Sequence, residues 1–269
     1  MAASGPAVPT LAKDDVITIC AVSLVAAALA NVLHEGIGHA LLALLTGAQS
    51  GVISTVAWSS YYDSRLVAAG GTLVNLAAAL IFWLVLRGAR NASAQTRYFL
   101  FTSLAFNAFT GTGYFFFSGV TNFGDWAVVI APMQPHWLWR SLLVVVGIAS
   151  YYGALLMVGG ALVRYVGVPL DEAGRFRKLA FIPYFSAIVL LSAGGLLNPI
   201  GMQLMWESAL PATVGAGCGL LWMRYYIAKS AAPEHGSPTI ARNVPWIIAA
   251  TLLSLAYIFV LGRGIPLHR

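Results

Sequence analysis

The sequence predicts an all-α protein, a polytopic bundle of about six or seven transmembrane helices. Of its 269 residues, 59% are hydrophobic and only 9% are charged, with a mean hydropathy of +0.80. Soluble globular domains carry about 25% charged residues. Several uncharged stretches also reach about 20 residues, the length that a helix needs to cross a bilayer. The expected surroundings are therefore membrane lipid, and the formal charge of +6 is no reason to expect nucleic-acid binding.

Seven apolar segments follow one another along the chain, and we expect them to form a single transmembrane domain over residues 16–262. A mobile tail of residues 1–15 should precede it, and a C-terminal tail of residues 263–269 should follow it. The first segment is long for one span and is expected to tilt or bend. The fifth should end where Pro199 breaks the helix. The segments cover about residues 16–46, 66–86, 98–117, 137–163, 179–198, 210–227 and 245–261.

The stretch that follows the first segment has a different composition. Its sequence, GAQSGVISTVAWSSYYD at residues 47–63, is rich in β-branched and small polar residues. That composition between turn residues is typical of a short strand or hairpin. We therefore expect a small β element at the membrane surface after the first span.

Basic residues divide unevenly between the two sides that seven spans would create. One side receives eleven lysines and arginines, and the other receives only Arg65, Arg140, Arg263 and Arg269. Because cytoplasmic loops carry an excess of basic residues, the N-terminus is predicted inside and the C-terminus outside. The expected location is the inner (plasma) membrane of a bacterium. The eleven are Lys13, Arg87, Arg90, Arg97, Arg164, Arg175, Arg177, Lys178, Arg224, Lys229 and Arg242.

Three titratable side chains stand together inside the first segment: His34, Glu35 and His39 in NVLHEGIGHALLALLTG, residues 31–47. An ionisable residue at the centre of a transmembrane helix costs at least about 2.5–3.5 kcal/mol on insertion scales. Histidine is the commonest zinc ligand, and an acid beside a metal can serve as a general base. A metal site therefore explains this cluster better than hydrogen bonds that only fix helix packing.

The spacing of the two histidines departs from the usual zinc motif H-E-x-x-H, in which both face one side of a helix. Here HEGIGH is H-E-x-x-x-H, and five residues of regular α-helix would separate His34 and His39 by roughly 140°. A one-residue π-bulge around Gly36 and Gly38 would absorb the extra position. Alternatively, Glu35 and His39 are the facing pair and His34 turns away. We favour the bulge.

A catalytic zinc usually has three protein ligands, so a third one is needed. Asp125, in SGVTNFGDWAVV, follows the outer end of the third segment and is flanked by Gly, Asn and aromatic residues. It is the first candidate, in a turn that re-enters the membrane. Glu207 is the second, because Pro199 should break the fifth helix nearby. Asp63 beside Arg65 is better explained as an interfacial ion pair.

HEGIGHALLALLTG, the β-like stretch and AAGGTLVNLAAAL at residues 68–80 together resemble the site-2 protease class of intramembrane zinc metalloproteases. The histidine spacing resembles the HELLGH motif of the dipeptidyl peptidase III family. The resemblance implies Zn²⁺ on His34 and His39, Glu35 as general base, and hydrolysis of peptide bonds in membrane-associated substrates. It also implies that Asn75 holds the substrate backbone or oxyanion, although an interhelical hydrogen bond explains this residue equally well. By analogy, the edge of residues 51–58 would accept an extended peptide.

Two other classes of function fit the same residues. The His–Glu cluster could relay protons or metal ions in a membrane transporter, where such residues and broken helices are frequent. A non-catalytic membrane scaffold would use the cluster only for packing. The H-E-x-x-x-H order and the lack of a sequence repeat favour the peptidase.

Overall fold

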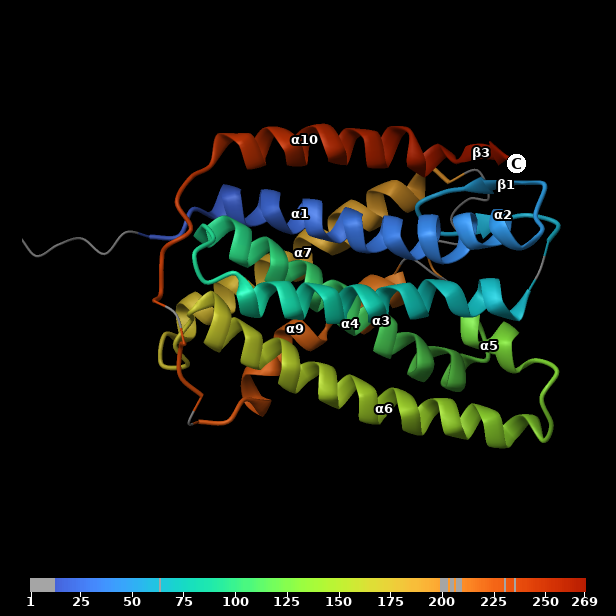
Figure 1. Ribbon diagram of the computed structural model, residues 1–269, viewed down its shortest axis with the longest axis horizontal. Coiled ribbons are helices and arrows are strands. Elements are labelled where there is room, and N and C mark those ends of the chain that lie inside the picture. The colour runs from blue at the N-terminus through green and yellow to red at the C-terminus, as the bar shows by residue number, and fades with distance from the viewer. Residues whose placement is uncertain are drawn as a thin grey trace, which may run out of the picture.

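The structure, a computed structural model, describes residues 13–62, 64–198, 203, 206, 210–229, 231–234 and 236–269. Its longer helices run side by side along one direction (Figure 1). The first is continuous from α1 (Val16–Val32) through a π-helix (Leu33–Leu41) into α2 (Leu42–Thr46). The other long helices are α3 (Arg65–Gly88), α4 (Ala94–Thr121), α6 (His136–Ala161), α7 (Ala173–Leu196) and α10 (Val244–Phe259).

Several helices begin where the sequence supplies a capping side chain. Asp15 accepts a hydrogen bond from the Thr18 amide at the start of α1, and Ser93 accepts one from the Thr96 amide at the start of α4. Asn243 does the same for Trp246 at the start of α10. Each cap satisfies an amide that has no partner within the first turn of its helix.

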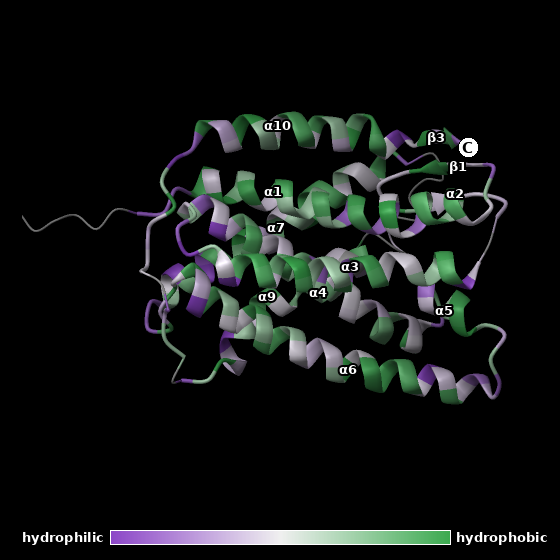
Figure 2. Cartoon of the chain, viewed as in Figure 1, coloured by the Kyte–Doolittle hydropathy of each residue, from purple (hydrophilic) through white to green (hydrophobic). Residues whose placement is uncertain are grey.

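Five helices are long and apolar enough to cross a membrane, which indicates a membrane protein. Apolar residues make up most of the length of these helices, and hydrophilic residues lie mainly toward the helix ends (Figure 2). The five are Val16–Thr46, Arg65–Gly88, His136–Val166, Ala173–Leu196 and Val244–Arg263. They match the first, second, fourth, fifth and seventh expected segments, so the larger count of six or seven spans is not confirmed.

The third and sixth expected segments account for the difference. The third is the helix α4, but it is not among the five apolar helices. The sixth is broken into a π-helix (Pro211–Ala216), the short helix α9 (Gly219–Trp222) and a 3₁₀-helix (Met223–Tyr226). The fifth ends at Leu196 as α7, and Pro199 lies outside the described residues.

A small antiparallel sheet covers one end of the bundle (Figure 1). The expected hairpin is present as β1 (Ser50–Ile53) and β2 (Trp58–Ser59), in which Val52 pairs with Ser59. A third strand, β3 (Ile265–His268), pairs with the other side of β1, so the order is β2-β1-β3. From the sequence, residues 263–269 were expected only as a C-terminal tail. The C-terminus instead occupies one edge of the sheet and leaves β2 at the other.

Candidate metal centre

A π-helix within the first long helix brings together the two histidines that a regular α-helix would separate. It covers Leu33–Leu41, so the expected bulge around Gly36 is confirmed. In a π-helix the hydrogen bonds run from residue i to i+5, which places side chains five residues apart above one another. The rings of His34 and His39 accordingly stand edge to face with their centres 4.8 Å apart. The alternative in which His34 turns away is wrong.

Asp125 meets both histidines from a different part of the chain. The Nε2 atoms of His34 and His39 lie 3.3 and 3.4 Å from the same oxygen, Asp125 Oδ2. One ligand atom from each residue lies within 4.8 Å of the others, so this group could hold a metal ion. Ligands about 2.0–2.1 Å from a tetrahedral zinc stand roughly 3.3–3.4 Å apart. The two nitrogen–oxygen distances therefore have the length of a tetrahedral edge.

Unsatisfied polar atoms support the same interpretation. His34 Nε2 and Asp125 Oδ2 are buried and have no hydrogen-bond partner in the described part of the chain. Such atoms are rare in folded proteins, because a buried polar group without a partner costs about 1–3 kcal/mol. Since both atoms face one small space between three potential ligands, a bound cation would satisfy them together.

The opposite nitrogen of each imidazole is held by a neighbouring helix. His34 Nδ1 lies 2.6 Å from Asn75 Oδ1, and His39 Nδ1 lies 2.8 Å from the Val67 carbonyl oxygen. Both partners accept, so each histidine carries its proton on Nδ1 and leaves Nε2 free as a ligand. Metal-binding histidines are usually oriented in this way by a second group.

Asn75 is itself fixed by two further hydrogen bonds. Its Nδ2 donates to the Ala30 carbonyl at 3.1 Å and to Asn107 Oδ1 at 2.7 Å, and Asn107 donates in turn to the Ser103 carbonyl. The amide hydrogens of Asn75 are thus used within the helix packing. Its geometry supports a role in orienting His34, and neither hydrogen points to a substrate.

Gly71 on α3 makes room for the two imidazoles. A Cβ atom at this position would stand 2.6 Å from His34 Nε2 and still closer to His39 Nε2. Any side chain there would occupy the space between the two potential ligands. This role of Gly71 was not predicted from the sequence, since no local pattern shows which glycine faces a distant pair of histidines.

A tight turn carries Asp125 to the site. α4 ends at Thr121, and the next residue, Asn122, and Gly124 both have positive φ angles, of 56° and 80°. Glycine adopts such angles without strain. The chain then reverses into α5 (Asp125–Ile130), with Asp125 as its first residue. Arg65 donates from Nε to the Val129 carbonyl at 2.8 Å, which attaches α5 to the start of α3.

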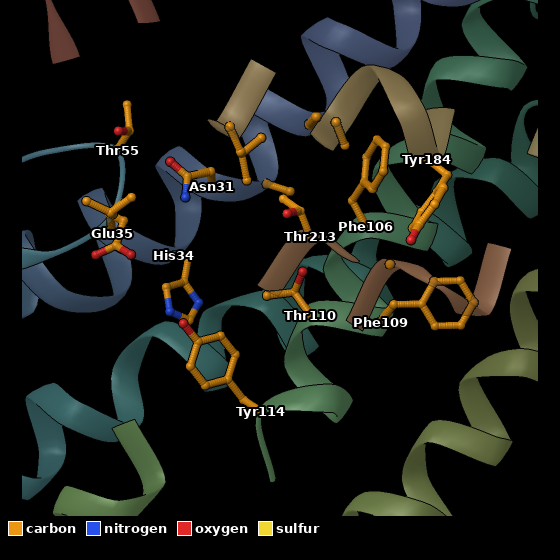
Figure 3. A pocket seen from close by; sticks show the side chains of 16 residues that line it. Asn31, His34, Glu35, Thr55, Phe106, Phe109, Thr110, Tyr114, Tyr184 and Thr213 are labelled. Carbon is orange, nitrogen blue, oxygen red and sulfur yellow. The ribbon is translucent and has the colours of Figure 1, made fainter. Parts of the chain in front are cut away.

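Glu35 lies between two cavities. The larger, of about 400 Å³, is lined by Glu35, His39, Asp125 and residues of β2. The smaller, of about 50 Å³, is lined by Glu35, His34, Asn31 and Thr55, and has room for a few water molecules (Figure 3). Glu35 Oε2 is buried and has no hydrogen-bond partner among the described residues.

Tyr114 is a second feature that the sequence analysis missed. Its ring stacks on His34 with the centres 5.0 Å apart and an angle of 27° between the planes. The Tyr114 hydroxyl lies beside the His34 ring in Figure 3. The residue lines both of the cavities that flank Glu35.

The remaining candidates fall outside this group. Glu207, the second choice for a third ligand, and Asp63, the expected partner of Arg65, lie outside the described residues.

Comparisons with protein-family models, curated proteins and solved structures gave no match. Fold and site together define a helical membrane protein with a buried His–His–Asp group that could hold a metal ion.

Proposed function

We propose that this protein is an intramembrane zinc peptidase that hydrolyses peptide bonds of membrane-associated substrates. One observation carries the proposal: Glu35, with an unpaired buried carboxylate oxygen, lies beside the converging ligands His34, His39 and Asp125, and shares the large cavity with His39 and Asp125. Two neutral imidazoles and a carboxylate are a donor set that suits zinc. When bound, zinc supplies Lewis-acid polarisation of the substrate carbonyl and of water.

The protein's own residues supply the proton transfers and the positioning. Glu35 takes a proton from the attacking water and delivers it to the leaving amine, as a general base and then a general acid. Asn75 and the Val67 carbonyl keep His34 and His39 in their ligand orientations. The small cavity beside Glu35 can store water within a largely apolar bundle.

The sheet offers a place for the substrate backbone. β2 is one of the two edge strands, and its residues Trp58 and Ser59 line the large cavity together with Glu35 and Asp125. An extended peptide can add to such an edge through main-chain hydrogen bonds. This arrangement would carry a peptide bond past the metal ligands.

The proposed topology has two crossings more than the five apolar helices. α4 has 28 residues, and Tyr98, Phe101 and Leu104 are fully buried among its neighbours. A helix enclosed by others needs less apolar surface than one facing lipid. Between α3 and α6 the chain also returns along α4 from one end of the bundle to the other (Figure 1), which supports a crossing by α4. We therefore propose α4 and the broken segment 210–226 as the additional crossings, with the basic end in the bacterial cytoplasm.

Replacement of Glu35 by glutamine tests the proposal. The Glu35→Gln protein should hold as much zinc as the wild type, and its rate on a fluorogenic peptide library in detergent micelles should fall about 10²–10⁴-fold. Asp171→Asn, an exposed change outside the site, is the matched control and should leave both unchanged. Unaltered hydrolysis by Glu35→Gln would remove Glu35 from the mechanism. A wild-type protein without metal would contradict the proposal as a whole.

His34→Ala, His39→Ala and Asp125→Ala extend the test to the ligands. Each should lose metal, as measured by elemental analysis of the purified protein. Full metal content in Asp125→Ala would show that another residue is the third ligand.

A further inference from the structure

A second polar cavity, of about 420 Å³, lies away from the metal centre. Its charged lining comes from four separate segments. Arg87 belongs to the last turn of α3, Arg90 to the α3–α4 connection, and Arg164 to the π-helix Leu162–Val166 that ends α6. Glu234 comes from the connection before α10. We call this cavity the arginine pocket.

The pocket carries an excess of positive charge. None of its three guanidinium groups forms an ion pair within the described ranges, where the ion pairs of arginine involve Arg175 and Arg242. Glu234 is the one carboxylate among the lining residues, so the pocket has a formal charge of +2. Three positive charges with a single carboxylate nearby still repel one another, which favours an anionic ligand.

Local contacts hold the walls of the pocket in place. The Arg87 guanidinium lies over the Trp83 ring, 4.5 Å from its centre. The Glu234 amide donates to the Arg164 carbonyl at 3.0 Å, which joins two segments far apart in the sequence. Cation–π and backbone contacts of this kind reduce the cost of ordering the side chains when a ligand binds.

The arginine pocket lies where the headgroups of a bilayer are expected. Two of the helices long enough to cross a membrane, Arg65–Gly88 and His136–Val166, both end at it. The polar headgroups of a bilayer lie at the ends of its spanning helices. Leu84 also lines the pocket, and with Leu80 one turn earlier it exposes about half of its surface. An apolar strip of α3 therefore leads directly into the group of arginines.

We propose that the arginine pocket binds the headgroup of an anionic phospholipid. The phosphate accepts charge-assisted hydrogen bonds from Arg87, Arg90 and Arg164, and the acyl chains lie along the strip formed by Leu80 and Leu84. Guanidinium groups suit this task because their paired donors match phosphate oxygens. Glu234 accepts a hydrogen bond from a headgroup hydroxyl, as in phosphatidylglycerol. The site is independent of the metal centre and of the peptidase function.

Lipid titration of the purified full-length protein in detergent tests the proposal. Binding of phosphatidylglycerol and of phosphatidylcholine is measured by native mass spectrometry and by the rise in Tm. The Arg90→Gln/Arg164→Gln protein should bind phosphatidylglycerol roughly thirtyfold more weakly, or about fivefold for each arginine. Arg177→Gln/Lys178→Gln removes the same charge from the same end of the bundle outside the pocket, and should bind like the wild type.

The outcomes distinguish a specific lipid site from general surface attraction and from a site for free phosphate. Selective binding of phosphatidylglycerol that only the pocket variant loses supports the proposal. Equal binding of both lipids, or equal losses in the two variants, would show general surface attraction and overturn it. Inorganic phosphate at millimolar concentration is the third arm. If it raises Tm as much as the lipid and displaces the lipid, the ligand is a free phosphate and the lipid assignment is wrong. The Tm of each variant in phosphatidylcholine shows whether it is folded.

Discussion

Replacement of Gly71 by alanine is expected to abolish tight metal binding while leaving the helix bundle folded. The added Cβ would stand 2.6 Å from His34 Nε2, whereas ordinary van der Waals contact begins at 3.4 Å. The ring would therefore have to move by about 0.8 Å. Plausible metal–ligand distances vary by only about 0.2 Å around their usual values. The displacement is several times larger than a metal site tolerates.

Neither ring can retreat freely from the new methyl group. His34 is held from behind by Asn75 at 2.6 Å, and His39 by the Val67 carbonyl at 2.8 Å. Changes that only weaken such supporting bonds lower metal affinity typically 10–100-fold. A methyl group between the ligands themselves should cost at least 100-fold, or about 2.7 kcal/mol.

Competition with a chromophoric zinc chelator measures this affinity directly. Gly88→Ala on the same helix is the matched control, because a Cβ there would meet nothing within 4 Å. Circular dichroism of both variants checks the helical content. A Gly71→Ala protein that keeps wild-type zinc affinity would refute the geometry of the site.

Three further results are expected. Asn75→Ala should lower zinc affinity about 10–100-fold by chelator competition, because His34 loses the acceptor that orients it, and unchanged affinity would contradict this support. Zinc affinity should also fall as the pH is lowered, since imidazoles bind metal only when neutral, and a flat profile from pH 8 to 5 would argue against histidine ligands. Asp14→Ala should lower the free energy of unfolding by about 1–3 kcal/mol in denaturant titration, because the half-buried Arg175 loses a carboxylate 2.7 Å away and the buried Ile240 amide loses its acceptor. Arg242→Gln, at an exposed pair, should cost less than about 1 kcal/mol, and similar losses in both would be inconsistent with this account.

The sequence allowed the first helix and its irregularity to be predicted in detail. The apolar run predicted the segment 16–46, and the structure has one apolar helix over Val16–Thr46. The five-residue histidine spacing predicted the π-helix, because two ligands so placed cannot share a metal on a regular helix. Both predictions used information within one stretch of chain, where periodicity and geometry are directly linked.

Features that depend on distant residues were harder to predict. β3 was missed because IPLH at the C-terminus has no strand pattern of its own, and it is ordered by pairing with β1. The sixth segment was expected as one helix from its hydropathy, although hydropathy does not report where a helix breaks. Asp125 was predicted from its place in a turn after the third segment. The positions of Gly71 and Tyr114 beside the histidines depend instead on how α3 and α4 pack against the π-helix.

The same packing explains why the bundle can contain so polar a group. His34, Asn75 and Asn107 form a chain of hydrogen bonds across three helices, which satisfies the inward-facing sides of the site. The facing atoms, His34 Nε2 and Asp125 Oδ2, stay unsatisfied without a further ligand. Because a buried polar atom without a partner is costly, a bound cation would stabilise the folded state as well as complete the site. Metal binding and stability would then be coupled through the same two atoms, so a chelator should lower the Tm of the wild type and leave that of His34→Ala unchanged.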